Sequence, residues 1–330
     1  MRELRRLWLH GLLFVLAAVL AFMKARPEAA GARVKGPTDV ELWAGKPSAV
    51  RRVELETKKK RVTLESQVDA AGQWYRGSEK ALEAAATPDA GAPDAGAAPR
   101  PEVVFVSVGV AQKLSEKLAP LVARHEIRDL DEERLAVFGF DKPFGTLRVQ
   151  VSETSYELDV GGTTPGGGDR YVRNTADGRV YTIDGSVVRD LDAGASRLKQ
   201  QDLNELKLSD PTLDGVRVKA DGQTREIVRG GPEGRRFWAA KDKPDDKDEK
   251  IGNWLDKLDK LRPLAFVEDK GEAELVVRVE YLRRGEVAGF TELYRRGDEY
   301  LVTSALLRLP GTLAKASAEQ VAQDVASLMQ

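Results

Sequence analysis

A strand pattern with a period of two residues recurs through the central stretch of the chain, 144–206. Apolar side chains occupy every second position in 147–151 and in 156–160, as expected for half-buried strands. Two further short strands are separated by a turn signal at 176–178, and the pattern then becomes helical. The stretch is therefore predicted to be a meander of four short strands followed by a helix.

A related set of elements precedes the meander. Alternating apolar residues predict strands at 50–57 and 60–66, a third strand around Trp74 and a fourth at 103–108. A helix is expected next, because apolar residues then recur at spacings typical of one helical face. The residues of this face are Val110, Leu114, Leu118, Leu121 and Val122.

The last third of the chain repeats this order. Strands are expected near Val216, Glu226 and Trp238, followed by an amphipathic helix over 251–261 and a second group of alternating strands. A final helix is predicted to begin at a capping box, 317–320. The three opening strands, the helix, the strands and the closing helix thus occur twice.

Single residues also match between the two halves. Trp74 aligns with Trp238 at the end of the opening strands, and 187–189 aligns with 306–308. Short alternating strands resemble one another by chance, but the shared order and the matched tryptophans favour an internal duplication. Trp238 is expected to lie in the core, so that its replacement by Ala would cost more stability than the same change at Trp43.

We therefore expect an α+β fold of two tandem similar units, 50–211 and 212–330. Each would be a mainly antiparallel β-sheet with helices packed on one face. The low-complexity stretch 82–101 consists mostly of Ala, Pro, Asp and Gly, and is expected to be a disordered loop inside the first unit.

The N-terminal segment from Leu7 to Met23 is apolar and carries no charged residue. Its length is near the minimum for a transmembrane helix. We expect an uncleaved membrane anchor after a short cytoplasmic flank, 1–6, and before a stalk, 24–49. The alternative is a cleaved signal peptide with its cleavage site near Ala30.

Basic residues flank both ends of this segment, so counting Lys and Arg does not decide its orientation. The short N-terminal flank favours a single-pass protein of the inner (cytoplasmic) membrane, with the bulk of the chain in the periplasm or extracytoplasmic space.

Composition excludes several kinds of chemistry. The sequence has no cysteine, which excludes disulfides, thiolate metal sites and a cysteine nucleophile. It has two histidines, of which His125 is expected near a helix end as a solvated side chain. The formal net charge is −1, so no overall field favours nucleic acid. No metal or cofactor site is expected.

Two stretches invite a functional interpretation. The glycine-rich stretch 161–170 lacks the Lys-Ser/Thr and the following helix of a phosphate-binding loop, and is better explained as a long hairpin turn. Glu153, Glu157 and Asp159 would provide a carboxylate pair for hydrolysis, but alternate positions in a polar hairpin usually form a solvated face. No catalytic residue is assigned.

Most of the chain after the stalk, and the first unit most clearly, resembles the bacterial family called domain of unknown function 4340. The resemblance rests on the stretches FGFDKP, LRVQV, YELDVGG, RYVRN and RVYTID, after an N-terminal anchor and a Trp-ended hairpin. Residues matching the family pattern include Gly161, Gly162, Tyr171 and Tyr181; Phe140 stands where Leu is usual. The resemblance implies an envelope protein whose genes often neighbour ABC-transporter components of the gliding-motility type. It implies no catalytic residues.

Three functions are weighed. The first is a non-enzymatic, membrane-anchored accessory or scaffold protein for an ABC-type export system, with transporter subunits as partners and no nucleic acid. The second is a periplasmic binding module for an envelope polymer or small ligand, using Trp43, Tyr75 or Tyr294 as stacking platforms. The third and weakest is a hydrolase. The sequence does not decide the oligomeric state.

Overall fold

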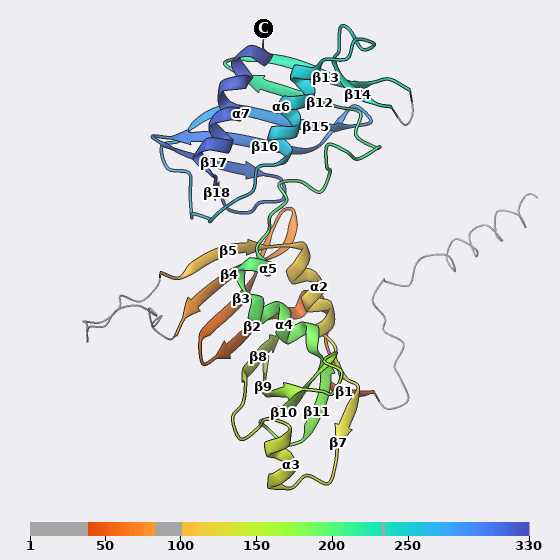
Figure 1. The fold of residues 1–330 in the computed structure, drawn as a ribbon, viewed down its shortest axis with the longest axis vertical. Coiled ribbons are helices and arrows are strands. Elements are labelled where there is room, and N and C mark those ends of the chain that lie inside the picture. Colours follow the sequence, from red (N-terminus) through yellow and green to blue (C-terminus); the bar gives the residue numbers. More distant parts are fainter. Residues whose placement is uncertain (1–38, 83–100, 233–234, 330) are drawn as a thin grey trace, which may run out of the picture. The chain divides into compact units, whose positions relative to one another are not determined.

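A computed structural model describes residues 39–82, 101–232 and 235–329 of the chain. The described part is a mixed α/β fold built mostly from antiparallel sheets with few helices (Figure 1). None of its helices is both long and apolar enough to cross a membrane. The predicted anchor, from Leu7 to Met23, lies outside the described residues, as does 83–100 of the predicted loop.

The first sheet contains nine strands among the described residues, in the order β5-β4-β3-β2-β8-β9-β10-β11-β7. All neighbouring strands are antiparallel. Its strands are β2 (Val50–Thr57), β3 (Lys60–Asp69), β4 (Gly72–Ala81), β5 (Val103–Ser107), β7 (His125–Ile127), β8 (Gly145–Val151), β9 (Thr154–Thr163), β10 (Asp169–Asn174) and β11 (Val180–Asp184).

Helices lie on one face of the first sheet (Figure 1). Helix α4 packs against β2 and β10, and α5 packs against β4 and β5. The helices of this part are α2 (Gly109–Leu118), α3 (Glu132–Val137), α4 (Gly185–Ala193) and α5 (Ala195–Leu198). A short antiparallel pair, β1 (Val40–Trp43) and β6 (Leu121–Ala123), and the 3-10 helix η1 (Pro47–Ala49) complete it.

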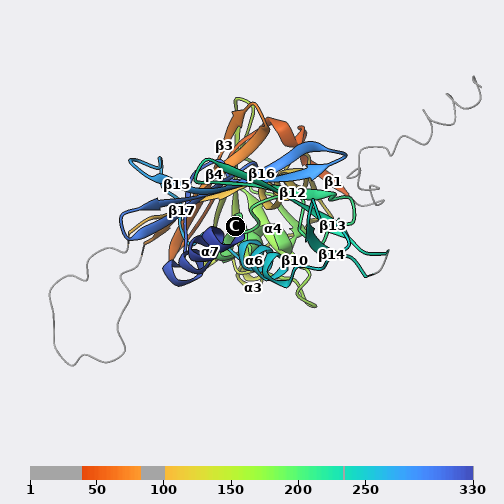
Figure 2. The same cartoon turned by 90° about the horizontal axis from the view of Figure 1, so that it is seen from above.

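The second sheet has the order β14-β13-β12-β15-β16-β17-β18 and is also antiparallel throughout. Its strands are β12 (Gly215–Ala220), β13 (Gln223–Gly230), β14 (Phe237–Ala240), β15 (Glu274–Arg283), β16 (Glu286–Arg296), β17 (Glu299–Ser304) and β18 (Gly311–Thr312). Helices α6 (Glu249–Asp259) and α7 (Lys315–Leu328) contact each other and lie on one face of this sheet (Figure 2).

The two sheets follow the same path. In each, three antiparallel strands are laid down in succession, and a helix then leads the chain back to the free side of the first strand. Four more strands extend the sheet outwards from there, and a closing helix follows. Strands β2, β8 and β9 of the first sheet therefore correspond to β12, β15 and β16 of the second. Strands β5 and β7 are additions at the edges of the first sheet.

Three expectations about the chain before β12 need correction. Residues 40–49, expected as the end of a stalk, are folded into β1 and η1. The predicted helix ends at Leu118, because Pro120 disfavours helical geometry at Ala119, the residue before it. Leu121 and Val122 lie instead in β6. His125 is exposed in β7, not at a helix end.

Two expectations about the second part are also wrong. The last helix begins at Lys315, and no side chain caps its first turn, so the motif 317–320 lies inside the helix. The match between 187–189 and 306–308 fails because the first segment lies in α4, whereas the second lies in the loop between β17 and β18. By order along the chain, α7 corresponds to α4.

Candidate functional site

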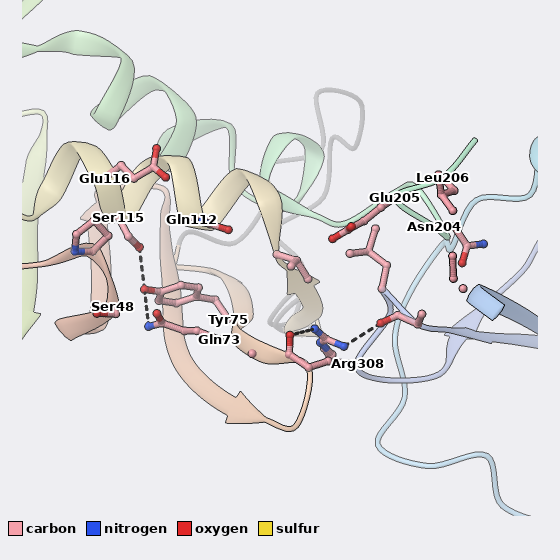
Figure 3. A pocket seen from close by; sticks show the side chains of 18 of the residues that line it. Ser48, Gln73, Tyr75, Gln112, Ser115, Glu116, Asn204, Glu205, Leu206 and Arg308 are labelled. Carbon is pink, nitrogen blue, oxygen red and sulfur yellow. Dashed lines mark hydrogen bonds between the residues drawn. The ribbon is translucent and has the colours of Figure 1, made fainter. Parts of the chain in front are cut away.

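A cavity of about 730 Å³ lies among segments that belong to both sheets (Figure 3). One wall comes from η1, the start of β4 and one side of α2. The other wall comes from the segment connecting the two sheets, the start of β16 and the chain after β17. This volume falls within the range of small-molecule sites, about 300–1,000 Å³.

Hydroxyl and carboxamide groups form the wall next to α2. The hydroxyls of Tyr75 and Ser115 are 2.7 Å apart, and Nε2 of Gln73 donates to the Tyr75 hydroxyl at 3.1 Å. Burial raises the pKa of Tyr75, although the contact with Ser115 opposes this. The phenol therefore stays neutral at physiological pH. The hydroxyls of this wall can bind a ligand through neutral hydrogen bonds, and the carboxylate of Glu116 on α2 lies in the same lining.

Asn204 and Arg308 form the opposite wall. Asn204 is 8% exposed, and its Nδ2 donates to the Thr291 hydroxyl at 2.7 Å. Arg308 is 11% exposed; its terminal nitrogens donate to the carbonyl oxygens of Ala305 at 2.8 Å and Ala71 at 3.3 Å. Among the described residues, Asn204 Oδ1 and Arg308 Nε have no hydrogen-bond partner.

Ion pairs join the segments of the first sheet to those of the second near the cavity. Arg308 Nε and Asp69 Oδ2 are 3.4 Å apart and form an ion pair. The two groups are not oriented for a hydrogen bond. Arg76 on β4 makes two hydrogen bonds with the carboxylate of Glu268, one of them 2.9 Å long. The cavity thus lies where the chain already makes cross-sheet contacts.

The glycines and tyrosines that match the family pattern lie away from the cavity and contribute to packing. Gly161 and Gly162 end β9 against the backbone of Phe138, whose carbonyl accepts the Gly162 N–H at 2.7 Å. The Tyr171 ring contacts the Phe138 ring at 4.5 Å between centroids, and Tyr181 is buried. None of these residues lines the cavity.

The two aligned tryptophans also lie outside the cavity lining. Trp74 and Trp238 are both half-buried, on β4 and β14. The guanidinium of Arg229 lies 4.8 Å from the centre of the Trp238 ring. Trp238 is thus at the margin of the core, and the expectation that it lies fully inside is wrong.

The proposed stacking platforms are also corrected. Trp43, Tyr75 and Tyr294 are 6%, 2% and 7% exposed, so none presents a free ring face to a ligand. The ring of Trp43 is stacked on Tyr156, with 4.5 Å between centroids. Aromatic stacking of a sugar by these three residues is therefore excluded in this conformation.

The candidate carboxylates are held by arginines. Glu157 pairs with Arg148 at 2.7 Å, and Asp159 pairs with Arg173 at 2.6 Å. Glu153 is exposed in the turn between β8 and β9. Among the described residues no cluster of three or more His, Asp or Glu is suited to a metal ion. These pairs fit the solvated face of a sheet.

On its polar face each sheet carries a carboxylate that is largely buried among cations. Glu54 on β2 lies 2.8 Å from Arg52 and 3.0 Å from Arg148. In the second sheet, Glu280 lies 2.8 Å from Lys219 and 3.0 Å from Arg278. Burial opposes ionisation of both, but the hydrogen bonds from these cations outweigh it and lower the pKa of each carboxyl group.

This arrangement predicts how stability depends on pH. A carboxyl whose pKa is lower in the folded state stabilises the fold above its unfolded pKa, about 4.3 for Glu, and loses that contribution as the pH falls through the folded value. We expect the free energy of unfolding to change little between pH 7 and pH 5 and to fall below about pH 4.5. Urea unfolding of the full chain across this range measures it.

The matched variant for this prediction is Glu54→Gln combined with Glu280→Gln, and the control is Glu153→Gln in the exposed turn. The double variant is expected to be less stable than the wild type at pH 7 and to approach it at low pH. An equal difference between the two proteins at pH 7 and pH 3.5 would show that the two carboxylates do not cause the acid sensitivity.

Sequence reasoning missed Asn204, Arg308 and Gln112. Asn204 lies in the leucine-rich run 203–208, and a polar residue among regularly spaced leucines was the one available signal. Arg308 gives no signal in the sequence, because its burial results from contacts with Asp69 and Ala71, far away along the chain.

Comparison with known proteins places the chain in a family. The family model described as a domain of unknown function (DUF4340) matches residues 111–276. The match begins in α2, includes the meander and the connecting segment, and ends in β15. No curated protein and no solved structure matches the chain. Because the matched residues make up half of the 330-residue chain, this protein belongs to the DUF4340 family.

Proposed function

We propose that this protein is a non-enzymatic accessory or scaffold protein of the inner membrane. In this proposal 7–23 anchors the chain, the bulk lies in the extracytoplasmic space, and subunits of an ABC-type transport system of the gliding-motility kind are its partners. The apolar N-terminal segment and the resemblance to an envelope family support the location and the partner.

The non-enzymatic part of the proposal rests on the pairing of buried carboxylates with arginine and lysine side chains. The carboxylates of Glu54 and Glu280 each lie within hydrogen-bond distance of Arg or Lys, and these hydrogen bonds outweigh the effect of burial and lower the pKa of both groups. A carboxylate held in this way is a poor general acid near neutral pH, because efficient proton transfer needs a pKa near the working pH. A sheet face that carries such ion pairs forms a stable, solvated surface.

The shared strand order of the two sheets supports an origin by internal duplication, as the sequence suggests. The proposal therefore treats the protein as two similar α+β units in tandem. Each unit keeps its helices on one face and its charged side chains on the other, and the contacts of Arg76 and Arg308 join the two. A partner could be bound where the two units meet.

A second candidate function is a binding module for an envelope polymer or a small ligand. The observation that favours it is the cavity of about 730 Å³, whose lining includes the polar side chains of Gln73, Gln112 and Asn204. In this alternative the ligand would be recognised by hydrogen bonds, since Trp43, Tyr75 and Tyr294 are buried.

Affinity purification tests the proposed function. The tagged full-length protein is extracted from its native membranes in mild detergent, and co-purifying proteins are identified by mass spectrometry. We expect transporter permease or ATPase subunits to be enriched at least tenfold over a tagged, unrelated single-pass control. Recovery of the protein alone would contradict the accessory function. Recovery of a mature form lacking residues 1–32 would contradict the anchor.

A further inference from the structure

We propose that a hollow on the polar face of the first sheet binds a phosphate group, carried by a small ligand or by a lipid headgroup. The hollow has a volume of about 360 Å³ and lies over β2, β3, β4 and β5, which are neighbours in the sheet (Figure 1). This volume falls at the lower end of the range of small-molecule sites, about 300–1,000 Å³. The inference goes beyond the proposed accessory function and does not depend on it.

The hollow is a row of short side chains between two rows of long ones. Thr63 on β3 lies opposite Ser78 on β4, and Ser78 lies opposite Val104 on β5. Because side chains alternate between the two faces of a sheet, the next residues on this face are two positions away along each strand. These flanking rows contain Arg61 with Lys80 on one side and Glu65 with Arg76 on the other.

Two hydroxyl groups form the floor of the hollow. Thr63 is 7% exposed, and its hydroxyl has no hydrogen-bond partner within the described part of the chain. This oxygen is accessible to a ligand, because Thr63 lines the hollow and its hydroxyl is not sealed in the interior. Ser78 is half-buried, and its hydroxyl is unpaired as well. Opposite side chains on antiparallel strands have Cβ atoms about 5 Å apart, so both hydroxyls can donate to one anion.

Lys80 supplies an unpaired positive charge at the hollow. Among the described residues its ammonium group forms no ion pair. Lys58 and Lys59 in the turn between β2 and β3 are also unpaired, and this turn is held to the end of β4 because the N–H of Leu82 donates to the carbonyl oxygen of Lys59 at 2.8 Å. Glu102 is the one unpaired carboxylate in the described lining. Unpaired cations therefore outnumber unpaired carboxylates here, which favours an anionic ligand.

Arginines beside the hollow are held in place by carboxylates and keep further donors. Arg61 donates to Glu56 through Nε and Nη2, at 2.9 and 2.7 Å, and Arg76 donates to Glu268 through its two terminal nitrogens. Within the described residues Arg61 Nη1 and Arg76 Nε have no hydrogen-bond partner. Ordered side chains lose little entropy on binding, and a phosphate ester offers several strong acceptor oxygens to such donors.

The second sheet fills the corresponding place with a carboxylate of its own. Thr63 is the fourth residue of β3 and Glu226 is the fourth residue of β13, and a two-residue turn precedes each of these strands. Glu226 accepts hydrogen bonds from Arg217 and Lys241. Because the two sheets share their strand order, an anion bound at Thr63 would occupy the place that the Glu226 carboxylate occupies in the second sheet.

Two other ligand classes are less well suited to the hollow. A cation is disfavoured because the nearest carboxylate is already paired: Glu54 lies opposite Thr63 but accepts hydrogen bonds from Arg52 and Arg148. An apolar ligand would meet Val104 as the only apolar side chain of the described lining, and the remaining side chains would lose hydration without gaining hydrogen bonds.

Isothermal titration calorimetry of the full-length protein in mild detergent tests this inference, in a phosphate-free buffer of low ionic strength. The probes are inorganic phosphate, glycerol 3-phosphate as a phosphorylated small molecule, and glycerophosphoglycerol as a lipid headgroup without its acyl chains. Acetate is the control for a simple anion. We expect a dissociation constant at least tenfold below that of acetate for one or more of the three probes. The probe that binds most tightly identifies the source of the phosphate group.

Two variants and a control locate the binding. Thr63→Glu introduces the carboxylate that Glu226 provides in the second sheet and is expected to abolish phosphate binding. Lys80→Gln removes the unpaired cation and is expected to weaken binding at least fivefold. The control is Lys241→Gln, the same loss of charge on the second sheet, at a side chain that is 65% exposed. It should bind phosphate as the wild type does.

Thr63→Val keeps the shape of the side chain and removes its hydroxyl, so it tests the site even if Thr63→Glu does not fold. We expect it to weaken phosphate binding at least threefold. Three outcomes would overturn the inference: no probe bound more tightly than acetate by the wild type, wild-type affinity in the folded Thr63 variants, and equal weakening by Lys80→Gln and Lys241→Gln. Recovery of transporter subunits plays no part in this test, so each proposal can fail without the other.

Discussion

Trp43→Ala is expected to lower the free energy of unfolding by about 3–5 kcal/mol, the range found when large aromatic side chains are removed from a core. Trp43 is 6% exposed and packs within the core of the first part. Its indole Nε1 donates to the carbonyl oxygen of Leu118 at 2.7 Å. Leu118 is the last residue of α2, so this carbonyl has no partner within the helix.

The change therefore removes apolar burial and a helix cap together. Loss of the stacked contact with Tyr156 adds to the effect, since such ring pairs contribute about 0.5–1.5 kcal/mol beyond their buried area. Urea unfolding of the full chain, followed by circular dichroism, measures the difference. Trp43→Phe separates the two causes, because it keeps most of the apolar volume and loses only the N–H donor.

Trp238→Ala is the matched comparison. Trp238 is half-buried on β14, and its contact with the Arg229 guanidinium is of a kind worth about 0.5–1 kcal/mol at exposed sites. We expect a loss of about 1–2 kcal/mol for the whole change, within the ordinary range for a partly buried residue. A loss at Trp238 equal to that at Trp43, or greater, would contradict the placement of both residues.

Gly161→Val is expected to destabilise the first part by about 2–3 kcal/mol through overpacking. A Cβ atom at position 161 would lie 2.4 Å from the carbonyl oxygen of Phe138 and 3.0 Å from the Phe140 ring. The carbonyl cannot move away easily, because it accepts the N–H of Gly162 at 2.7 Å. The close approach of two backbones explains why glycine is needed here.

Gly168→Ala is the control for this prediction. Gly168 lies in the same glycine-rich stretch, before β10, and a Cβ atom there would meet no heavy atom within 4 Å. We expect its free energy of unfolding to stay within about 0.5 kcal/mol of the wild type. Indistinguishable unfolding curves for Gly161→Val and Gly168→Ala would show that the contact with Phe138 does not restrict the side chain at position 161.

Periodicity identified most of the strands because it reports a local property. In β8 and β9 the side chains alternate between a buried and a solvated face, so Leu147, Val149 and Leu158 reveal the strands before any pairing is known. Turn residues such as Gly178 then set the hairpins. The glycine-rich stretch was assigned correctly for the same reason: β9 and β10 pair on either side of it.

Local pattern failed where a partner distant in sequence decided the structure. The segment 40–49 has no clear period, but it folds because β1 pairs with β6 and Trp43 reaches the end of α2. Tyr75 and Tyr294 were candidate platforms because an aromatic residue in a strand has the same local pattern whether its face is covered or open. The packing of other segments buries both of them.

The absence of cysteine, the near-neutral charge and most of the strands can be read directly from the sequence, and so can the resemblance to the DUF4340 family. Each of these depends on composition or on the order of neighbouring residues. The pairing of the carboxylates and the set of residues that line the cavity depend instead on contacts between segments far apart in the sequence. Asn204 and Arg308 illustrate the reason: their burial is a sum of contacts with Thr291, Asp69 and Ala71, and spacing along the chain does not encode it.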